Sequence, residues 1–465
     1  METSLLHQAL KIAERYQARV ATEPVFPRIT PEEMRKALRA PLAESGVEAS
    51  GVISELALAA ERGLVASSGP RYFGFVIGGS LPVTTAADWL AAAWDQNAGL
   101  YATSPAASVV EEAAAEWLLD LLRLPAKASV GFVTGCGMAN FTALAAARHH
   151  VLQQAGWDVE EDGLQSAPPI NVIVGEEVHV TVITALRMVG LGARKVRRVP
   201  TDAQGRMIAS GLRTIVKDCT GPTIVCAQAG NVNTGAFDPL EEIAGIVREH
   251  SGGSAWIHVD GAFGLWAAAS DRLRHLVKGV ENCDSWATDA HKWLNVPYDS
   301  GLVTTAHPEA HRAAMTTSAA YLVQSNRERD PFEWTPEFSR RARGFAIYAA
   351  LKHLGRSGVR DLVERCCARA RQIAELLGAH KGIEILNDVV LNQVLVRFNG
   401  SDEDTRAVIT RVQQDGTCWL GGTTWHNMAA MRISVSNWST TERDMEMSAE
   451  AILRAAGVRS AVAEG

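Results

Sequence analysis

The sequence predicts an α/β fold built on a mostly parallel, seven-stranded sheet. Two observations lead to this prediction. Short apolar runs rich in β-branched residues recur along the middle of the chain, and stretches with helical spacing of apolar residues separate them. Strands that read as nearly continuous apolar runs are typical of a sheet buried on both faces. The predicted strands are residues 130–134, 172–174, 196–199, 223–227, 255–259, 285–288 and 302–305.

The chain on either side of this sheet is predicted to form two smaller parts. Apolar residues three and four apart indicate helices, and prolines separate the first two of these helices. The predicted helices are residues 4–20, 31–43, 86–94, 108–122, 345–354 and 359–377. Two further strand-like pieces lie near the C-terminus, at residues 389–398 and 431–435.

These patterns divide the chain into three segments. We expect an N-terminal helical segment (1–65), a large domain that carries the sheet (66–345), and a small C-terminal α+β domain (346–465). The N-terminal helices either lie on a partner subunit or pack on their own domain, and both alternatives stay open at this point.

The composition is that of a globular protein. The chain has 465 residues, of which 47% are hydrophobic and 21% charged, which argues against disorder. The net charge of −7 gives no basic surplus for a phosphate backbone, so we expect no nucleic-acid partner. We find no apolar run of about 18 residues and expect no membrane partner. Seven irregularly spaced cysteines favour free thiols in a reducing, cytoplasmic location.

Two residues that could carry chemistry follow predicted strands. Asp260 comes directly after the fifth strand, and Lys292 follows the sixth. Ligands of open α/β sheets bind outside the carboxyl ends of the strands. A desolvated lysine can form a Schiff base with a carbonyl, and a carboxylate can keep a cofactor ring nitrogen protonated. The alternatives are a surface lysine and, for Asp260, a structural cap or a metal ligand together with His258.

Two further features follow the first and second strands. Gly135, Cys136 and Gly137 form a glycine-rich turn before a predicted helix, where free N–H groups and the helix dipole could hold a phosphate. A plain tight turn is the alternative, because the spacing matches neither a Walker loop nor a dinucleotide fingerprint. His179 alone reads as a structural histidine. Together, however, the turn, the histidine, the acid and the lysine follow four different strands, which favours a shared site.

At these residues the chain resembles the group II pyridoxal-phosphate-dependent amino acid decarboxylases, which are similar to aromatic-L-amino-acid decarboxylase. The resemblance covers roughly residues 65 to 450. Its most specific segment reads Asp-Ala-His-Lys-Trp-Leu-Asn-Val-Pro-Tyr at 289–298 and resembles the family's Schiff-base lysine motif. It implies the aspartate-aminotransferase-like fold, fold type I. The other matching segments are residues 230–238, 258–263, 340–343 and 432–438.

The resemblance implies pyridoxal 5′-phosphate as the cofactor and gives roles to matched residues. Lys292 would form the internal aldimine, and Asp260 would pair with the pyridine nitrogen. His179 would stack on one face of the ring and Ala262 would pack on the other. Lys292, His179 and Asp260 are therefore the predicted catalytic residues.

The same resemblance implies the other contacts of the site. Asn231 would bind the ring hydroxyl or the substrate carboxylate, with Asn233 as a close rival. Asn97 either binds a polar group of the substrate or is bonded within the protein. The phosphate would be held by Gly135, Cys136, Gly137, Asp289 and His291. The substrate side chain would lie against Phe75, Asn97 and Tyr101.

The reaction that the resemblance implies is decarboxylation of an L-amino acid to the amine, through a quinonoid intermediate, by a homodimer with its active site at the interface. Gly137 lacks the hydroxyl usual at the phosphate turn, so one phosphate hydrogen bond would be missing or supplied elsewhere. Pro331 stands where aromatic members have a proton-donating tyrosine, the nearest tyrosine being Tyr321, and this departure keeps other outcomes open. The alternatives are an aldehyde synthase, an aminotransferase, a carbon–carbon lyase, or an inactive homologue that serves as a binding subunit.

Overall fold

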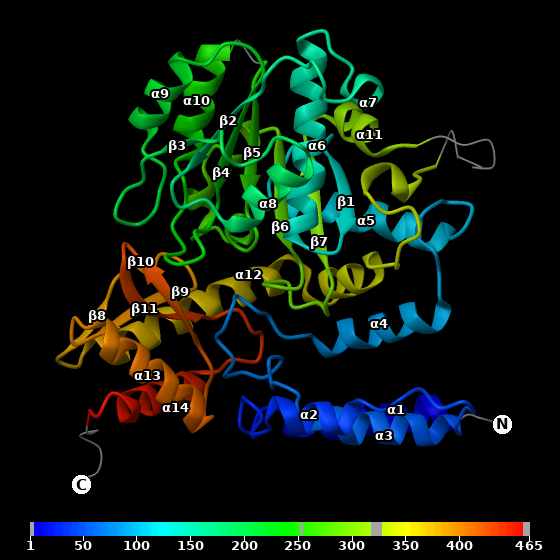
Figure 1. Ribbon diagram of the computed structural model, residues 1–465, viewed down its shortest axis with the longest axis vertical. Helices are drawn as coiled ribbons and strands as arrows, with labels where there is room; N and C mark the ends of the chain where they lie inside the picture. The colour runs from blue at the N-terminus through cyan, green and yellow to red at the C-terminus, as the bar shows by residue number, and fades with distance from the viewer. Residues whose placement is uncertain (1–3, 252–253, 318–327, 459–465) are drawn as a thin grey trace. The chain divides into compact units, whose positions relative to one another are not determined.

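The computed structural model describes residues 4–251, 254–317 and 328–458, and the chain divides into two compact units (Figure 1). The larger unit comprises residues 78–371 and 387–394. The smaller unit comprises the chain up to Ile77, residues 372–386, and the chain from Leu395 onward. The three-segment division at residues 65 and 345 stays a prediction beside these two units.

The larger unit contains a seven-stranded sheet in the order β1-β7-β6-β5-β4-β2-β3. Strand β7 runs antiparallel to both of its neighbours, and the remaining pairs are parallel. The predicted mostly parallel, seven-stranded sheet is therefore confirmed. The strands are β1 (Ser129–Val133), β2 (Asn171–Gly175), β3 (Arg197–Val199), β4 (Thr223–Gln228), β5 (Trp256–Asp260), β6 (Ser285–Asp289) and β7 (Gly301–Thr305).

Parallel pairing brings the carboxyl ends of β4, β5 and β6 to one edge of the sheet. The register pairs Gln228 with Asp260, and Asp260 with Ala287. Strand β1 lies antiparallel to β7, which lies antiparallel to β6, so β1 runs in the same direction as β6. The turn at Gly135 after β1 therefore reaches the same edge as Asp260.

Helix α6 (Cys136–Gln154) covers one face of this sheet, with α8 and α11 beside it (Figure 1). It lies mainly on β5, β6 and β7. Its alanine and leucine residues favour a helix, and several of them belong to one buried cluster with apolar residues of β2, β4 and β5. The remaining elements of the larger unit are α4 (Pro82–Trp94), α5 (Pro105–Leu121), α7 (Val159–Asp162), α8 (Val180–Met188), α9 (Ala209–Lys217), α10 (Leu240–Ser251), α11 (Pro308–Met315), and the 3-10 turns η1 (Gly264–Ala269), η2 (Arg274–Val277), η3 (Val280–Asn282) and η4 (Pro331–Trp334).

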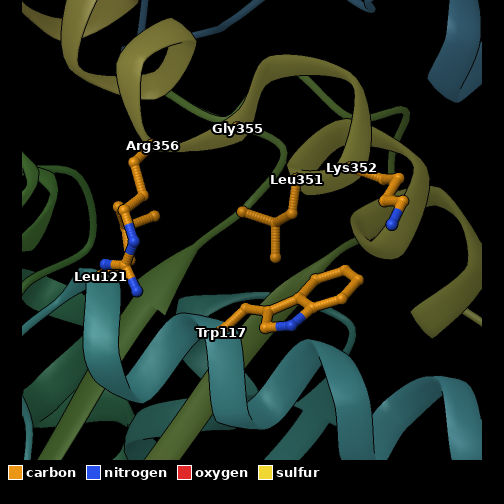
Figure 2. Close-up of a pocket in the computed structure, with 6 residues that line it drawn as sticks. All are labelled: Trp117, Leu121, Leu351, Lys352, Gly355 and Arg356. Carbon is orange, nitrogen blue, oxygen red and sulfur yellow. The ribbon is translucent and has the colours of Figure 1, made fainter.

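The long helix α12 (Gly344–Gly378) is interrupted at Gly355, where φ is 60° and ψ is −177°. Glycine tolerates a positive φ that would strain other residues, so the break falls between the two helices that the sequence predicts here. A cavity of about 370 Å³ lies between α5 and α12 at this break (Figure 2). It contains none of the predicted site residues. Its lining consists of Trp117, Leu121, Leu351, Lys352, Gly355 and Arg356.

A buried ion pair joins α5 to the start of α12. The Arg340 side chain is fully buried, and its guanidinium lies 2.7 Å from the Glu111 carboxylate. It also donates to the carbonyl oxygens of Ala98 and Phe132, at 2.7 and 2.6 Å. The carboxylate and the two carbonyl oxygens that bind this guanidinium all belong to the larger unit.

Replacing Glu111 by alanine is expected to lower the free energy of unfolding by about 3–5 kcal/mol, because the Arg340 charge would stay buried without its carboxylate. The matched control is Asp88→Ala, which removes the partner of the part-exposed Arg341 at 2.8 Å and should cost less than about 1 kcal/mol. Denaturant unfolding measures both values. Equal losses in the two variants would contradict the expectation.

The smaller unit contains helices α1 (Ser4–Arg19), α2 (Pro31–Leu38) and α3 (Ala49–Glu61). It also carries a four-stranded sheet in the order β10-β11-β9-β8. No helix in residues 4–251, 254–317 and 328–458 combines the length and apolar character that crossing a membrane requires. The other elements are β8 (Ile383–Ile385), β9 (Gln393–Phe398), α13 (Asp402–Asp415), β10 (Gly421–Trp425), β11 (Met428–Ser434) and α14 (Glu442–Ala455).

Candidate active site

Lys292 lies in the turn that follows β6, and its side chain is 18% exposed. Its Nζ is 2.9 Å from Asp289 Oδ2. Burial acts to lower the pKa of this amine, but the Asp289 carboxylate, together with Cys136 and Asp260, outweighs burial and raises the pKa. Lys292 is therefore not a solvated surface lysine. It is a cation held among acidic groups at the edge of the sheet.

Asp260 is the last residue of β5 and is 4% exposed. Its Oδ1 accepts hydrogen bonds from Ala262 N at 3.1 Å and from Cys136 Sγ at 3.4 Å. Its Oδ2 accepts from Asn140 Nδ2 at 3.2 Å. Burial, and then the Asp260 and Asp289 carboxylates, raise the pKa of Cys136 well above its usual range, so its thiol stays a donor. Three donors thus fix the orientation of the Asp260 carboxylate.

The glycine-rich turn is held in place by the Asp289 carboxylate and by close packing of main chain on main chain. Cys136 N donates to Asp289 Oδ1 at 2.6 Å. A Cβ atom at Gly301 of β7 would lie 2.4 Å from Gly135 Cα, so the two backbones pack directly on each other. A Cβ atom at Gly137 would meet nothing within 4 Å, so there is open space over the first turn of α6. A helix N-terminus with open space before it suits an anion such as phosphate.

His291 lies next to Asp289 behind this turn. Its Nδ1 accepts from Ser300 N at 3.2 Å, and its Nε2 lies 3.5 Å from Asp289 Oδ1. Burial lowers the pKa of His291, although the Asp289 carboxylate opposes this effect. The neutral ring therefore carries its proton on Nε2, directed toward Asp289. Direct contacts of Asp289 and His291 with a phosphate remain predictions.

Two further predicted residues lie at the ends of neighbouring elements. His179 caps the N-terminus of α8, where its Nδ1 lies 3.4 Å from Thr181 N and 2.8 Å from Thr181 Oγ1. Asn231 is 1% exposed, and its Oδ1 accepts from Asn233 N at 2.8 Å. Among the described residues, Asn231 Nδ2 has no hydrogen-bond partner. A buried donor in this state indicates a missing acceptor, which makes Asn231 a stronger candidate than Asn233.

These groups fit the cofactor that the resemblance implies. The Lys292 amine suits an aldehyde, and the oriented Asp260 carboxylate suits a protonated ring nitrogen. The open N-terminus of α6 suits a phosphate, and the orphaned Asn231 donor suits a ring hydroxyl or a substrate carboxylate. The structure brings Lys292, Asp260 and Cys136 close enough to interact electrostatically.

The predicted substrate residues are placed differently. Asn97 Oδ1 accepts from Arg340 N at 3.1 Å, which favours the alternative that Asn97 is bonded within the protein. Tyr101 N donates to Asp330 Oδ1 at 2.8 Å. Phe75 belongs to the smaller unit, where it is 64% exposed and stacks on Trp419 with ring centroids 5.6 Å apart. Roles in substrate binding remain predictions for all three residues.

His258 and Asn140 form a contact that sequence reasoning missed. His258 Nδ1 lies 2.9 Å from Ser285 Oγ, and His258 Nε2 lies 2.9 Å from Asn140 Oδ1. Both ring nitrogens are thus engaged, which favours a hydrogen-bonding role over the metal-ligand alternative. The available signal was a polar Asn140 among the apolar residues of a predicted helix, facing the buried side.

The departure at Pro331 is also visible. Pro331 begins the short turn η4 and is buried. Tyr321, the nearest tyrosine in the sequence, lies outside the described residues. The proton donor of the reaction is therefore not assigned to either position.

Comparison with known proteins identifies the family. Residues 31–399 match the family model described as the pyridoxal-dependent decarboxylase conserved domain. The chain is 26% identical over 457 residues to an aromatic-L-amino-acid decarboxylase of Bacillus atrophaeus (94% of this chain, 92% of the relative). It is 28% identical over 373 residues to an acidic amino acid decarboxylase of Xenopus tropicalis (77% and 70%). It is 24% identical over 461 residues to a 4-hydroxyphenylacetaldehyde synthase of Rhodiola rosea (94% and 90%).

The fold agrees with this result. The crystal structure of Oryza sativa TDC with PLP and tryptamine matches with a TM-score of 0.90 at 23% identity, over 97% of this chain and 96% of that chain. This likeness confirms the predicted fold. Because the family model spans most of the sequence, the chain belongs to the pyridoxal-dependent decarboxylase family and is an amino acid carboxy-lyase with pyridoxal 5′-phosphate as its cofactor.

Proposed function

We propose that this chain removes the α-carboxylate of an L-amino acid as carbon dioxide and releases the corresponding amine. The observation that carries the proposal is the grouping of Lys292 and Asp260 at one edge of the sheet, within electrostatic reach of each other. Bound pyridoxal phosphate supplies an electron sink for the bond that breaks. The chain's own residues choose that bond by holding the substrate in one orientation.

Each residue has a distinct task in this proposal. The Lys292 amine would hold the cofactor through its aldehyde group. The Asp260 carboxylate, fixed by three donors, would hold a proton on the ring nitrogen. The unpaired Asn231 Nδ2 donates to the ring hydroxyl or the substrate carboxylate. His179 packs on the ring face opposite Ala262.

Asn97 gives no support to a polar substrate side chain. Its amide oxygen already accepts from Arg340 N within the protein. The relatives named above act on aromatic or on acidic amino acids, according to their names. We propose an aromatic L-amino acid as the first substrate to test, because one of the relatives aligned over most of both chains is named an aromatic-L-amino-acid decarboxylase.

A second candidate is an aldehyde synthase, and Pro331 favours it. The resemblance places a proton-donating tyrosine at this position in aromatic decarboxylases. Without that donor, oxygen could take two electrons from the substrate after carbon dioxide has left and become hydrogen peroxide, and water would then release the aldehyde and ammonia. The relative from Rhodiola rosea is named for such a product.

A product panel separates these outcomes. Purified protein with pyridoxal phosphate is incubated with aromatic, acidic and aliphatic L-amino acids, and carbon dioxide, amine, ammonia and peroxide are measured together. We expect carbon dioxide and amine in equal amounts with an aromatic substrate. Carbon dioxide with ammonia and peroxide would replace the proposal by the aldehyde synthase. Ammonia without carbon dioxide, or no product at all, would overturn both.

We further propose that the chain acts as a homodimer in the cytoplasm. Large apolar side chains are exposed on the N-terminal helices, among them Leu6 at 75% and Leu58 at 72%. Neither α2 nor α3 contributes a buried residue. A second copy of the chain would cover this surface, in line with the first of the two alternatives left by the sequence.

All seven cysteines are free and buried, which supports a reducing compartment such as the cytoplasm.

A further inference from the structure

A chain of buried hydrogen bonds leads from Asp260 to Trp256. The two end groups determine which atom donates and which accepts in each of these bonds. At one end, the Trp256 indole can only donate, and its Nε1 lies 2.8 Å from Ser285 Oγ. At the other end, an ionised Asp260 can only accept, so the Asn140 atom 3.2 Å away must be Nδ2. Asn140 therefore presents its oxygen to His258.

Both end groups require the same tautomer of His258, with the proton on Nε2. With Asn140 Oδ1 as the acceptor, His258 Nε2 must carry a proton, at a distance of 2.9 Å. Burial lowers the pKa of His258 to about 4, although the Asp260 carboxylate opposes this, so the ring is neutral near pH 7. Its Nδ1 then accepts from the Ser285 hydroxyl at 2.9 Å. That hydroxyl has its oxygen left to accept from Trp256, as the first end requires.

Asn140 is the branch point of this chain. Its Nδ2 has two hydrogens, and the second lies toward Thr181 Oγ1 at 3.3 Å. Thr181 N donates to His179 Nδ1 at 3.4 Å, so Nδ1 is an acceptor. The Thr181 hydroxyl, whose oxygen lies 2.8 Å from the same nitrogen, therefore directs its hydrogen to Nδ1 and can accept from Asn140 with its oxygen. Two donors face Nδ1, and a His179 ring with a single proton carries that proton on Nε2.

We propose that Asn140 is a positioning residue that couples the two groups on which the cofactor ring depends: it fixes the Asp260 carboxylate toward the ring nitrogen and, through Thr181, holds His179 as the tautomer protonated on Nε2. The proposal rests on the proposed function for the meaning of the site. Asn140, His258 and Ser285 are each fully buried, so water does not compete for these bonds.

The burial of Asn140, His258, Ser285 and Asp260 strengthens the hydrogen bonds of the Asp260 branch, whereas Thr181 and His179 of the other branch are half-buried. Removing Asn140 would leave the His258 Nε2 proton and one Asp260 oxygen without partners inside the protein. Unsatisfied buried groups are costly, and a hydrogen bond to a charged group contributes more than a neutral one. A side chain at position 140 with similar volume and no polar atoms should therefore disturb both branches without creating a cavity.

The test uses Asn140→Leu, Thr181→Val and the control Thr142→Val. Thr142 is also fully buried on α6, but its hydroxyl donates to the carbonyl of Met138 in the same helix. Two quantities are measured in each variant. One is the dissociation constant of pyridoxal phosphate, by titration of the apoprotein. The other is the set of ¹⁵N shifts of the His179 and His258 rings, assigned by single histidine substitutions.

We expect Asn140→Leu to raise the dissociation constant about 10- to 100-fold, the effect of one hydrogen bond to a charged group. It should also shift the His258 signals and allow His179 to exchange between two tautomers. Thr181→Val should alter only the His179 signals and leave the dissociation constant within about threefold, because Asp260 keeps its donor. Thr142→Val should change neither quantity.

Wild-type values in folded Asn140→Leu protein would overturn the proposal, as would an unchanged His179 ring in Thr181→Val. If Asn140→Leu lacks a cooperative thermal transition, Thr181→Val alone decides the His179 branch, and Asn140→Ser takes the place of the leucine variant for the Asp260 branch. These readouts involve no product. A failed product panel would therefore remove the proposed function, and unchanged binding would remove the role of Asn140, as two separate results.

Discussion

Lys292→Ala is expected to lower turnover by about 10⁴-fold or more, in the range seen when a covalent catalytic group is removed. The reason is that no other described amine lies beside Asp260 and Asp289 in the way that Lys292 does, with Nζ 2.9 Å from Asp289 Oδ2. Steady-state carbon dioxide release measures the loss. Borohydride reduction of the wild-type holoenzyme, followed by peptide mass analysis, should find the cofactor attached at position 292.

The matched control for this variant is Lys278→Ala. Lys278 is 71% exposed and is paired with Glu241 on the surface, so its removal should leave turnover and the reduced cofactor peptide unchanged. Thermal unfolding of both variants checks that the fold is intact. Labelling of the wild-type protein at any lysine other than 292, or turnover in Lys292→Ala near the wild-type level, would refute the assignment.

Asp260→Asn is expected to lower kcat about 10²–10³-fold, the range found when a group that stabilises developing charge is removed. The amide has nearly the same shape as the carboxylate, so the loss would come from its charge and its accepting capacity at the ring nitrogen. An amide nitrogen would also face either Asn140 Nδ2 or the Cys136 thiol, both of which donate in the wild-type protein. The absorbance spectrum of the bound cofactor should change together with kcat.

Asp284→Asn is the control for that second variant. Asp284 is a buried carboxylate just before β6, at the end of that strand away from Lys292. It pairs there with Arg248 at 2.7 Å and with His307 at 2.8 Å. Its replacement should reduce stability but leave the cofactor spectrum as in the wild type. If Asp260→Asn merely lowered stability to the same degree and kept its spectrum and kcat, Asp260 would be a structural cap, the alternative that the sequence left open.

The parts of the fold that could be predicted have a local sequence signal, and the missed parts do not. Strands β4, β5 and β6 are fully buried, and they are short segments rich in apolar and β-branched residues that can be recognised locally. The predicted strand at 431–435 overlaps β11, but its hairpin partner β10 was not predicted. The turn of this hairpin is made by His426 and Asn427 at φ values of 45° and 63°, without the glycine that usually marks such turns, and β10 is half exposed.

The residues of the candidate site likewise divide into those with a local sequence signal and those without one. Lys292 and Asp260 could be proposed because each follows a recognisable strand, and strand ends are where such folds bind ligands. Asn140 could not, because its partners His258 and Asp260 lie 118 and 120 residues away in sequence and only the folded sheet brings them together. Asn97 was given two alternatives for the same reason, and its bond to Arg340 N spans 243 residues.

The contact between Gly135 and Gly301 has a consequence for how this enzyme can vary. The turn that precedes α6 is located by the Gly135 main chain resting on Gly301 and by the Asp289 carboxylate, which accepts from Cys136 N. Neither contact involves a side chain at position 137, and a Cβ atom there would meet nothing within 4 Å. Residue 137 can therefore be exchanged without displacing the loop, so the groups that this turn presents can change while the main chain beneath them stays unaltered.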